Sequence, residues 1–445
     1  MKKDRNIAIT LIFLLMITIG LLVINYLNNL PPTIVKVTYA NFYNEDRSRG
    51  VTLKIKRHNT KPIYCIFKHG EDISEKVLVK KNKCSYNVVT DNYEVELDYN
   101  QNNKVTYDRK FNIDGVLGVK FNNKKLYMAL NETFNLETNL DKVGNVDYLV
   151  KYNSSNEDII SIDQNGTLVG KQTGTSTITV TVEDIKETWD ITVSNLIRPM
   201  ELNNKKSIVP CNKYTNDQIN ELDKILASRV EVAGVGTRAA AVAVSRFLTL
   251  EFPYKVPYFY ENGRISTTGV DGEGRYYRKG LYLGVDKQRE ITKVMAGPAS
   301  WGCPLTNYED NEYRKPNVRY PNGLDCSGYV SWILVNSGQD LGDIGAGFSH
   351  KFNYTQVGEL NKNTYEFLHS GNVRPGDLIG WDGHIAMIGG MTDTKIYVTE
   401  SLLPGVIMDE YDYSSPSSSF YRRYDHIIDM SNVYKGDGNL RNMWW

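Results

Sequence analysis

A cysteine stands at the predicted start of a helix in the C-terminal part of this 445-residue sequence. Residues 321–323 (Pro-Asn-Gly) have the composition of a turn, and Asp325 is of a type that commonly caps a helix N-terminus. Cys326 would then be the first helical residue, and Gly338 would end the helix. Unpaired N–H groups at a helix start carry partial positive charge, which favours a thiolate. We therefore expect the pKa of Cys326 to lie below its usual value of about 8.5, as in a reactive nucleophile.

Two predicted strands farther along the chain offer a base for this thiol. Residues 374–381 have the pattern of a turn leading into an apolar strand, and His384 begins the next strand. A third short strand ends at Glu400, and side-chain alternation fixes the face on which this carboxylate lies. If that face meets the strand of His384, Glu400 can accept an N–H of the imidazole. Cys326, His384 and Glu400 would then supply a nucleophile, a general base and a group that orients the base.

Three segments carry these residues in order. They are Asn-Gly-Leu-Asp-Cys-Ser-Gly-Tyr-Val at 322–330, Arg-Pro-Gly-Asp-Leu-Ile at 374–379 and Gly-His-Ile-Ala-Met-Ile-Gly at 383–389. Together they resemble the signature blocks of the NlpC family, papain-like cysteine peptidases of bacterial cell walls. The resemblance covers roughly 215–411. It implies an α+β papain-like domain, with helices packed on a small antiparallel sheet, and a catalytic pair formed by Cys326 and His384.

The same resemblance suggests roles for other residues. The family's third catalytic residue is usually a second histidine, sometimes Asn, Gln or an acid, and Glu400 is the nearest match here. Asp325 and Ser327 correspond to residues that shape the substrate pocket. The pair at 257–258 resembles a Pro-Tyr pair whose hydroxyl reaches the active site, so Tyr258 is a candidate substrate-binding residue. The insertion 261–320 follows that pair, and we expect it to form a lid or a substrate wall.

The composition argues against several other functions. The six histidines are scattered, and no cluster has the short ligand spacing of a zinc site. Neither a metal nor an organic cofactor is therefore expected. Fifty-two basic residues balance fifty-two acidic ones, and no basic block points to a nucleic-acid partner.

The N-terminus has the pattern of a membrane anchor. Residues 7–24 are uncharged and mostly apolar, and about 20 such residues span a bilayer. Residues 25–32 contain no small-residue cleavage site of the kind that ends a secretory signal. Lys2, Lys3 and Arg5 favour a cytoplasmic N-terminus, which would leave the bulk of the chain extracellular, in the cell-wall zone of a Gram-positive bacterium.

The five cysteines suit an extracellular protein, where disulfides are allowed. An odd number leaves at least one thiol free or paired between chains. Cys65 and Cys84 could pair within one β domain, and Cys211 with Cys303 could join the start of the last domain to the insertion. These pairings would leave Cys326 as the free thiol that the mechanism requires.

Two β-rich segments separate the anchor from the C-terminal domain. Segment 31–115 has period-two runs between turn-rich pieces, which indicates a β-sandwich, possibly Ig-like. In segment 116–195, the turn 164–166 precedes a strand that alternates Ile178, Val180 and Val182 with threonines. This second segment resembles the group-two bacterial Ig-like domain. Such a domain usually serves as a spacer, although binding of a glycan or a surface protein is the alternative.

The predicted fold class is multidomain, with an N-terminal transmembrane helix, two β-sandwich modules and a C-terminal α+β papain-like domain. The expected domains are 1–30 (cytoplasmic tip and signal-anchor), 31–115, 116–195, 196–214 (linker) and 215–445.

The leading hypothesis is a membrane-anchored cysteine endopeptidase that cleaves peptidoglycan stem peptides. The family resemblance implies a preference for the bond next to γ-D-glutamate. Two alternatives remain open: amidase or acyl-transfer chemistry on the same Cys-His pair, and a non-catalytic surface protein that binds through its Ig-like modules.

Overall fold

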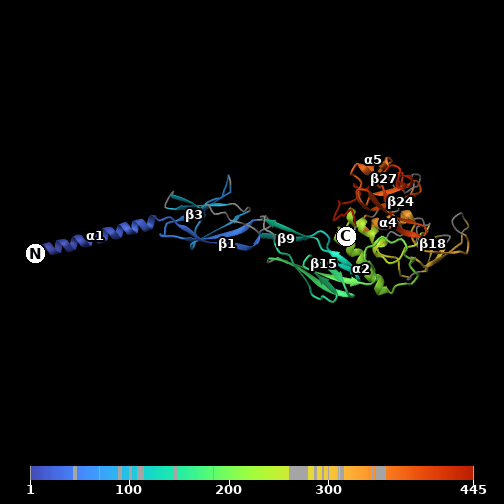
Figure 1. Ribbon diagram of the computed structural model, residues 1–445, viewed down its shortest axis with the longest axis horizontal. Helices are drawn as coiled ribbons and strands as arrows, with labels where there is room; N and C mark the ends of the chain where they lie inside the picture. Colours follow the sequence, from blue (N-terminus) through green and yellow to red (C-terminus); the bar gives the residue numbers. More distant parts are fainter. Residues whose placement is uncertain are drawn as a thin grey trace. The chain divides into compact units, whose positions relative to one another are not determined.

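A computed structural model gives the fold of most of the chain (Figure 1). It describes residues 2–43, 48–69, 71–88, 93–99, 103–107, 115–143, 148–183, 185–259, 279–284, 288–292, 295–298, 300–308, 310, 315–339, 341–342, 344–346 and 357–443. Much of the predicted insertion, including 261–278, lies outside these ranges. The chain divides into two compact units, which are described separately: Met1–Lys120 with Thr138–Lys151 and Thr181–Glu187, and Phe121–Glu137 with Tyr152–Val180 and Thr188–Trp445.

The first unit begins with helix α1 (Lys2–Asn29). Its segment Ile9–Asn29 is long and apolar enough to cross a membrane, judged by length and composition. The predicted N-terminal apolar helix is therefore present.

Two small antiparallel sheets follow α1, as the period-two pattern predicts. One sheet has the order β1-β2-β6, and the other has the order β4-β3-β7-β8, with β5 also paired to β3. Their bounds are β1 (Thr33–Tyr43), β2 (Arg49–Lys56), β3 (Ile63–His69), β4 (Asp72–Ile73), β5 (Val77–Leu78), β6 (Lys83–Val88), β7 (Glu94–Tyr99) and β8 (Asn103–Tyr107).

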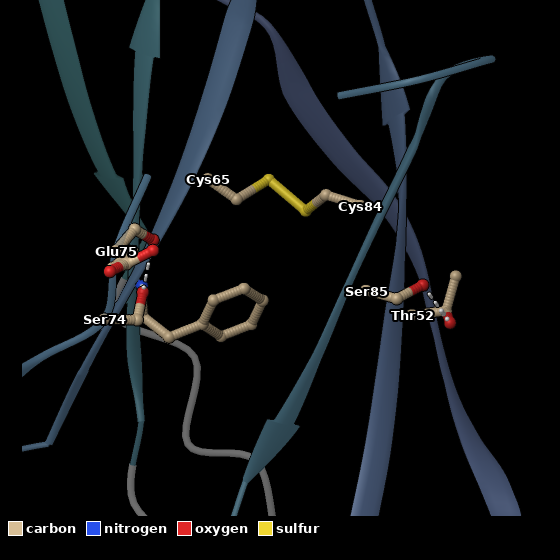
Figure 2. Close-up of a disulfide and its surroundings, with 7 residues drawn as sticks. Thr52, Cys65, Ser74, Glu75, Cys84 and Ser85 are labelled. Atoms are coloured by element: carbon tan, nitrogen blue, oxygen red, sulfur yellow. Dashed lines mark hydrogen bonds between the residues drawn. A yellow bond between two sulfur atoms is a disulfide. The ribbon is translucent and has the colours of Figure 1, made fainter. Parts of the chain in front are cut away.

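Alternate side chains of both sheets form one buried core. Val51 and Leu53 of β2 pack in the same cluster as Val95 and Leu97 of β7. Within this core a disulfide joins Cys65 of β3 to Cys84 of β6 and thereby links the two sheets, as Figure 2 shows. The predicted pairing is thus confirmed, and the segment has the two-layer arrangement of a sandwich.

The strands of the next module are arranged in three sheets: β10-β17-β16-β13, β11-β15-β14 and β12-β9. Their bounds are β9 (Gly115–Phe121), β10 (Tyr127–Ala129), β11 (Thr133–Asn135), β12 (Thr138–Val143), β13 (Lys151–Ser154), β14 (Ile160–Ile162), β15 (Thr167–Gly170), β16 (Gly174–Val182) and β17 (Ile185–Ser194).

The predicted turn at 164–166 joins β14 to β15. The Asp163 carboxylate accepts the N–H groups of Asn165 and Thr167 at 2.9 and 2.8 Å, and Gly166 has a φ of +82°. A glycine takes this left-handed conformation without the strain that a Cβ would add.

Within the second unit, the Ig-like residues pack on the helices that follow them. Arg229, on helix α2 (Asn216–Ala233), donates N–H groups from Nε and Nη2 to the Glu251 carboxylate. Nη2 also donates to the Tyr127 carbonyl of β10 at 3.0 Å. Ala129 belongs to the same buried cluster as the helices, and Asn439 donates to the Asn122 carbonyl at 2.6 Å.

Two helices begin the C-terminal part. Helix α2 (Asn216–Ala233) starts at a Thr215 capping box, and helix α3 (Arg238–Arg246) starts at Thr237. Helix α3 passes directly into the π-helical turn η1 (Phe247–Glu251).

A six-stranded antiparallel sheet, in the order β22-β27-β23-β24-β25-β26, forms the centre of the C-terminal part. Helices α3 and α4 contact strand β24 of this sheet, and α4 also contacts β25. The bounds are α4 (Cys326–Ser337), β22 (Glu359–Asn361), α5 (Thr364–His369), β23 (Leu378–Trp381), β24 (His384–Met391), β25 (Lys395–Leu402), β26 (Gly405–Asp412), α6 (Ser419–Arg423) and β27 (His426–Asp429).

Part of the insertion falls within the described residues. It contains a sheet of β18 (Gln288–Thr292), β19 (Met295–Pro298), β20 (Pro304–Asn307) and β21 (Arg319–Pro321). The predicted disulfide between Cys211 and Cys303 is present. Asn322 exchanges backbone hydrogen bonds with Gly302 and Cys303, so the disulfide is tied to the segment that leads into Cys326.

Candidate active site

Cys326 is the first residue of α4, as the capping pattern predicts. Asp325 has extended backbone angles, and its carboxylate accepts the N–H of Gly328 at 2.7 Å. The Ser327 hydroxyl donates to the same carboxylate at 3.2 Å, and Gly338 ends the helix with a φ of +104°. The chain therefore fixes the thiol at a helix N-terminus through a local side-chain cap.

The pKa of this thiol is raised, whereas the sequence analysis predicts a lowered pKa. Burial raises the pKa of Cys326 to about 12, because the side chain is only 7% exposed, and the charge of Asp325 adds to the rise. Hydrogen bonds from the backbone amides of Ile385, Ser327 and Cys326 act against this rise without cancelling it. The helix start does favour the thiolate, but loss of water costs the charged form more.

The contact with Ile385 places the sulfur beside strand β24. His384 directly precedes Ile385 and opens that strand, so the sulfur lies near the end of β24 from which the base candidate projects. Packing of α4 on β24 provides the contact between these two parts of the chain. Cys326 is the free cysteine of the structure.

His384 and Glu400 form a buried pair. Imidazole Nε2 lies 2.7 Å from Glu400 Oε2, and both side chains are almost completely shielded from water. The register of β24 and β25 pairs Met387 with Thr399, which places Glu400 on the same face as His384. Trp381 stacks on the imidazole with ring centroids 4.1 Å apart. Nδ1 is the other ring nitrogen and is the one that could serve the thiol.

Two residues that the sequence analysis did not single out complete the surroundings of Glu400. Arg423 Nη2 donates to Oε1 at 2.8 Å, and the hydroxyl of Tyr424 donates to the same oxygen at 3.1 Å. Both residues belong to the aromatic and basic run 421–424 at the end of α6. That run was the available signal, but nothing in its spacing linked it to a carboxylate on β25.

Tyr258 lies on a segment that pairs with Leu324, just before Cys326 in the chain. Its backbone forms a parallel bridge with Leu324, and the N–H of Leu324 donates to the Pro257 carbonyl at 3.0 Å. A Cβ on Gly323 would lie 1.9 Å from that carbonyl oxygen, so the close approach requires glycine at 323. The backbone of Tyr258 is thus near the start of α4, and a role of its side chain in binding substrate remains a prediction.

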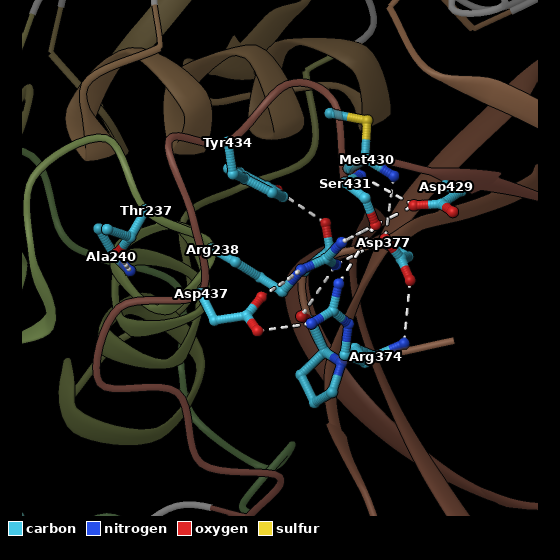
Figure 3. A network of polar contacts seen from close by, with 12 residues as sticks. Thr237, Arg238, Ala240, Arg374, Asp377, Asp429, Met430, Ser431, Tyr434 and Asp437 are labelled. Atoms are coloured by element: carbon cyan, nitrogen blue, oxygen red, sulfur yellow. Dashed lines mark hydrogen bonds and ion pairs between the residues drawn. The ribbon is translucent and has the colours of Figure 1, made fainter. Parts of the chain in front are cut away.

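The turn at 374–377 has a structural function that its resemblance to a peptidase block did not reveal. Asp377 is fully buried, pairs with Arg238 at 2.6 Å and accepts the backbone N–H groups of Arg374 and Met430 (Figure 3). The ring of Tyr434 lies beneath the Arg238 guanidinium at 5.0 Å. This network attaches α3 to the turn before β23 and so holds the sheet that carries His384.

Among the described residues, no group of three or more His, Cys, Asp or Glu side chains is placed to hold a metal ion. Two clefts lie elsewhere in the described part of the chain. One of about 650 Å³ includes Asp217 and Lys224 of α2, and one of about 520 Å³ includes Arg374 and Asp429. Neither is lined by the Cys326 or His384 side chains.

Comparison with known proteins identifies one module. Residues 118–193 match the bacterial Ig-like domain (group 2), which confirms the interpretation of that segment. No match to a peptidase family was found for the C-terminal part, and no curated protein matches the chain.

Solved structures show only weak similarity. S-layer protein SbsC domains 4 and 5 are 15% identical, cover 24% of this chain and 67% of their own, and give a TM-score of 0.18. The N-terminal eight Ig domains of Down Syndrome Cell Adhesion Molecule are 9% identical, cover 37% and 24%, and give 0.25. The fibronectin(III)-like modules of Clostridium thermocellum CbhA are 11% identical, cover 36% and 94%, and give 0.18. TM-scores this low support no conclusion about this chain.

Proposed function

We propose that this chain is a membrane-anchored extracellular thiol hydrolase that cleaves cell-wall stem peptides. The observation that carries the proposal is the buried His384–Glu400 pair at the end of β24, next to the strand residue whose amide contacts the Cys326 sulfur. The NlpC-like sequence blocks and the antiparallel sheet with packed helices agree with a papain-like domain. The bond next to γ-D-glutamate is the expected site of cleavage.

The chemistry would begin with a proton transfer. His384 accepts the Cys326 proton at Nδ1 while Glu400 holds the N–H at Nε2, and the sulfur attacks the scissile carbonyl. The backbone amide of Cys326 at the helix start can stabilise the oxyanion. Collapse of the tetrahedral intermediate breaks the C–N bond, and the imidazolium gives its proton to the leaving amine. Water then attacks the thioester, with His384 as base, and restores the thiol.

The proposed location follows from the N-terminal part. Segment Ile9–Asn29 would cross the membrane with its preceding lysines and arginine in the cytoplasm. The two β modules would then lie outside, where the disulfides at 65–84 and 211–303 are chemically stable.

The test is digestion of purified peptidoglycan by the full-length protein in detergent, with products identified by mass spectrometry. The wild type should release stem-peptide fragments, whereas Cys326→Ala and His384→Ala should release none. His369→Ala changes an exposed histidine on α5 and provides a matched control that should remain active.

The products also separate the alternatives. Cleavage between sugar and peptide would indicate an amidase, and transfer to an added amine would indicate an acyl transferase. An active Cys326→Ala variant would refute the assignment of the nucleophile. A wild type that binds cell walls without cleaving them would support the non-catalytic alternative.

A further inference from the structure

The side chain of Arg423 lies behind the His384–Glu400 pair and extends the arrangement to a fourth residue. Glu400 is 0% exposed, and a carboxylate in such a place is stable only if hydrogen bonds and a countercharge replace water. Its two carboxylate oxygens have different hydrogen-bond partners. Oε2 meets His384, while Oε1 receives Arg423 Nη2 at 2.8 Å and the Tyr424 hydroxyl at 3.1 Å.

Aromatic rings hold the guanidinium of Arg423 in place. Its central carbon lies 5.8 Å from the centroid of Trp381, 5.8 Å from that of Tyr411 and 5.5 Å from that of Tyr424. Trp381 also stacks on His384, so one indole contacts both groups that flank the Glu400 carboxylate. A planar guanidinium suits such a site better than an ammonium group, because it can bond in its plane and stack on its faces.

A second acid, Asp409, lies near Glu400 and also interacts with the positive charge of Arg423. Asp409 lies on β26, and burial and then the charge of Glu400 raise its pKa, whereas Arg423 and Lys255 lower it. Glu400 is therefore surrounded by His384 from β24, Arg423 and Tyr424 from the α6 region, and Asp409 and Tyr411 from β26. Lys255 also acts on Asp409, but Arg423 is the cation of this group that bonds the Glu400 carboxylate directly.

We propose that Arg423 is a positioning residue, which keeps Glu400 ionised and turned so that Oε2 faces the imidazole. The inference rests on the proposed thiol chemistry and adds a residue that acts on the base through Glu400. Without the arginine, Glu400 would lose the cation bonded to Oε1 and would keep a second acid beside it in a dry site, an arrangement that favours its protonated form. A protonated Glu400 donates to His384 Nε2, which moves the ring proton to Nδ1 and removes the acceptor for the Cys326 proton.

The test compares pH–rate profiles of Arg423→Gln, Arg423→Lys and the wild type. The acid limb is the low-pH side of the profile, where the rate falls as the pH falls. We expect Arg423→Gln to shift this limb to higher pH and so to lower kcat/KM at pH 7 by about 10- to 100-fold, since a shift of one pH unit lowers the rate about tenfold. Above pH 9 the difference should shrink to a few-fold. Arg423→Lys should fall between the two, because it retains the charge but not the planar geometry.

Two further variants separate positioning from a purely structural role. Arg423→Gln combined with Asp409→Asn removes the repelling acid and should move the acid limb back toward the wild type. Arg422→Gln alters the neighbouring exposed arginine on α6 and should change nothing. If Arg423→Gln lowers the rate equally at every pH, or the double variant fails to restore the limb, the inference is wrong.

The rate at which iodoacetamide alkylates Cys326, measured as a function of pH, reports on the same proton transfer without a substrate. If the wild type cleaves no peptidoglycan but the alkylation limb of Arg423→Gln moves to higher pH, the proposed function fails and the role of Arg423 stands. If the wild type cleaves peptidoglycan and neither profile moves, only the role of Arg423 fails. A wild-type thiol that neither reacts nor turns over between pH 5 and pH 10 overturns both.

Discussion

Replacing Glu400 by glutamine would test the tautomer of His384 directly. The substitution keeps the length of the side chain but exchanges one oxygen for an NH₂ group. Arg423 Nη2 and the Tyr424 hydroxyl both donate toward Oε1, so the amide oxygen of the glutamine should stay on that side. Its NH₂ group then faces His384 Nε2, at the position where the carboxylate oxygen lies 2.7 Å away.

An NH₂ group at this position forces Nε2 to accept, and the ring proton must move to Nδ1. That tautomer cannot take the proton of Cys326. Losing a charged hydrogen bond costs about 1.5–3 kcal/mol, and stabilisation of the imidazolium is lost as well. We therefore expect a total of about 3–5 kcal/mol, which lowers kcat/KM by roughly two to four orders of magnitude at 1.36 kcal/mol per tenfold.

The assay is release of stem-peptide fragments under initial-rate conditions, together with the rate of Cys326 alkylation at pH 7. Glu410→Gln serves as the matched control, because Glu410 lies on the adjacent strand β26 in an exposed pair with Lys395. Thermal melting should show that Glu400→Gln remains folded. A folded variant that retains more than half of the wild-type rate in both assays would refute the orienting role of Glu400.

Three predictions concern stability. Asp377→Ala leaves the buried Arg238 cation without its carboxylate and should lower the free energy of unfolding by about 3–5 kcal/mol in urea titrations; a loss below about 1 kcal/mol would contradict a stabilising role of the Arg238–Asp377 network. Changing both Cys211 and Cys303 to serine opens a loop of 92 residues and should cost about 2–4 kcal/mol; an unchanged urea midpoint would show that the disulfide adds nothing. Burial raises the pKa of Tyr434, so its contribution to stability is complete below the unfolded value of about 10 and is lost as pH rises above it. Tyr434→Phe should therefore flatten the decline in stability between pH 10 and pH 11, and an identical slope in both proteins would refute this.

Local signals predicted the elements that carry the candidate site. Asp325 caps α4 through its own side chain, and strand alternation fixes the face of Glu400, so both features depend on neighbouring residues alone. The Cys65–Cys84 and Cys211–Cys303 pairings, which the sequence analysis offered as one possibility, are also present and leave Cys326 free.

Features that depend on packing between distant segments could not be predicted in the same way. Arg423 reaches Glu400 because α6 lies against β26, and no periodicity in the chain encodes that contact. The pKa of Cys326 was misjudged for the same reason. A helix start is a local property, whereas burial by residues from several elements is not. The Arg238–Asp377 pair joins residues far apart in the chain, and only the fold reveals it.

The raised pKa of Cys326 changes how the candidate site would work. A thiol held protonated by burial is a poor nucleophile at rest, so the proposed attack would require transfer of its proton to His384. The imidazolium that forms is also buried, and Glu400 supplies the charge that stabilises it. Since Arg423 bonds the other oxygen of Glu400, the proposal implies that a residue at the end of α6 would influence the reactivity of the sulfur. In the proposed site, a buried thiol and a buried carboxylate would be compatible because the imidazole can take up the proton that the thiol gives away.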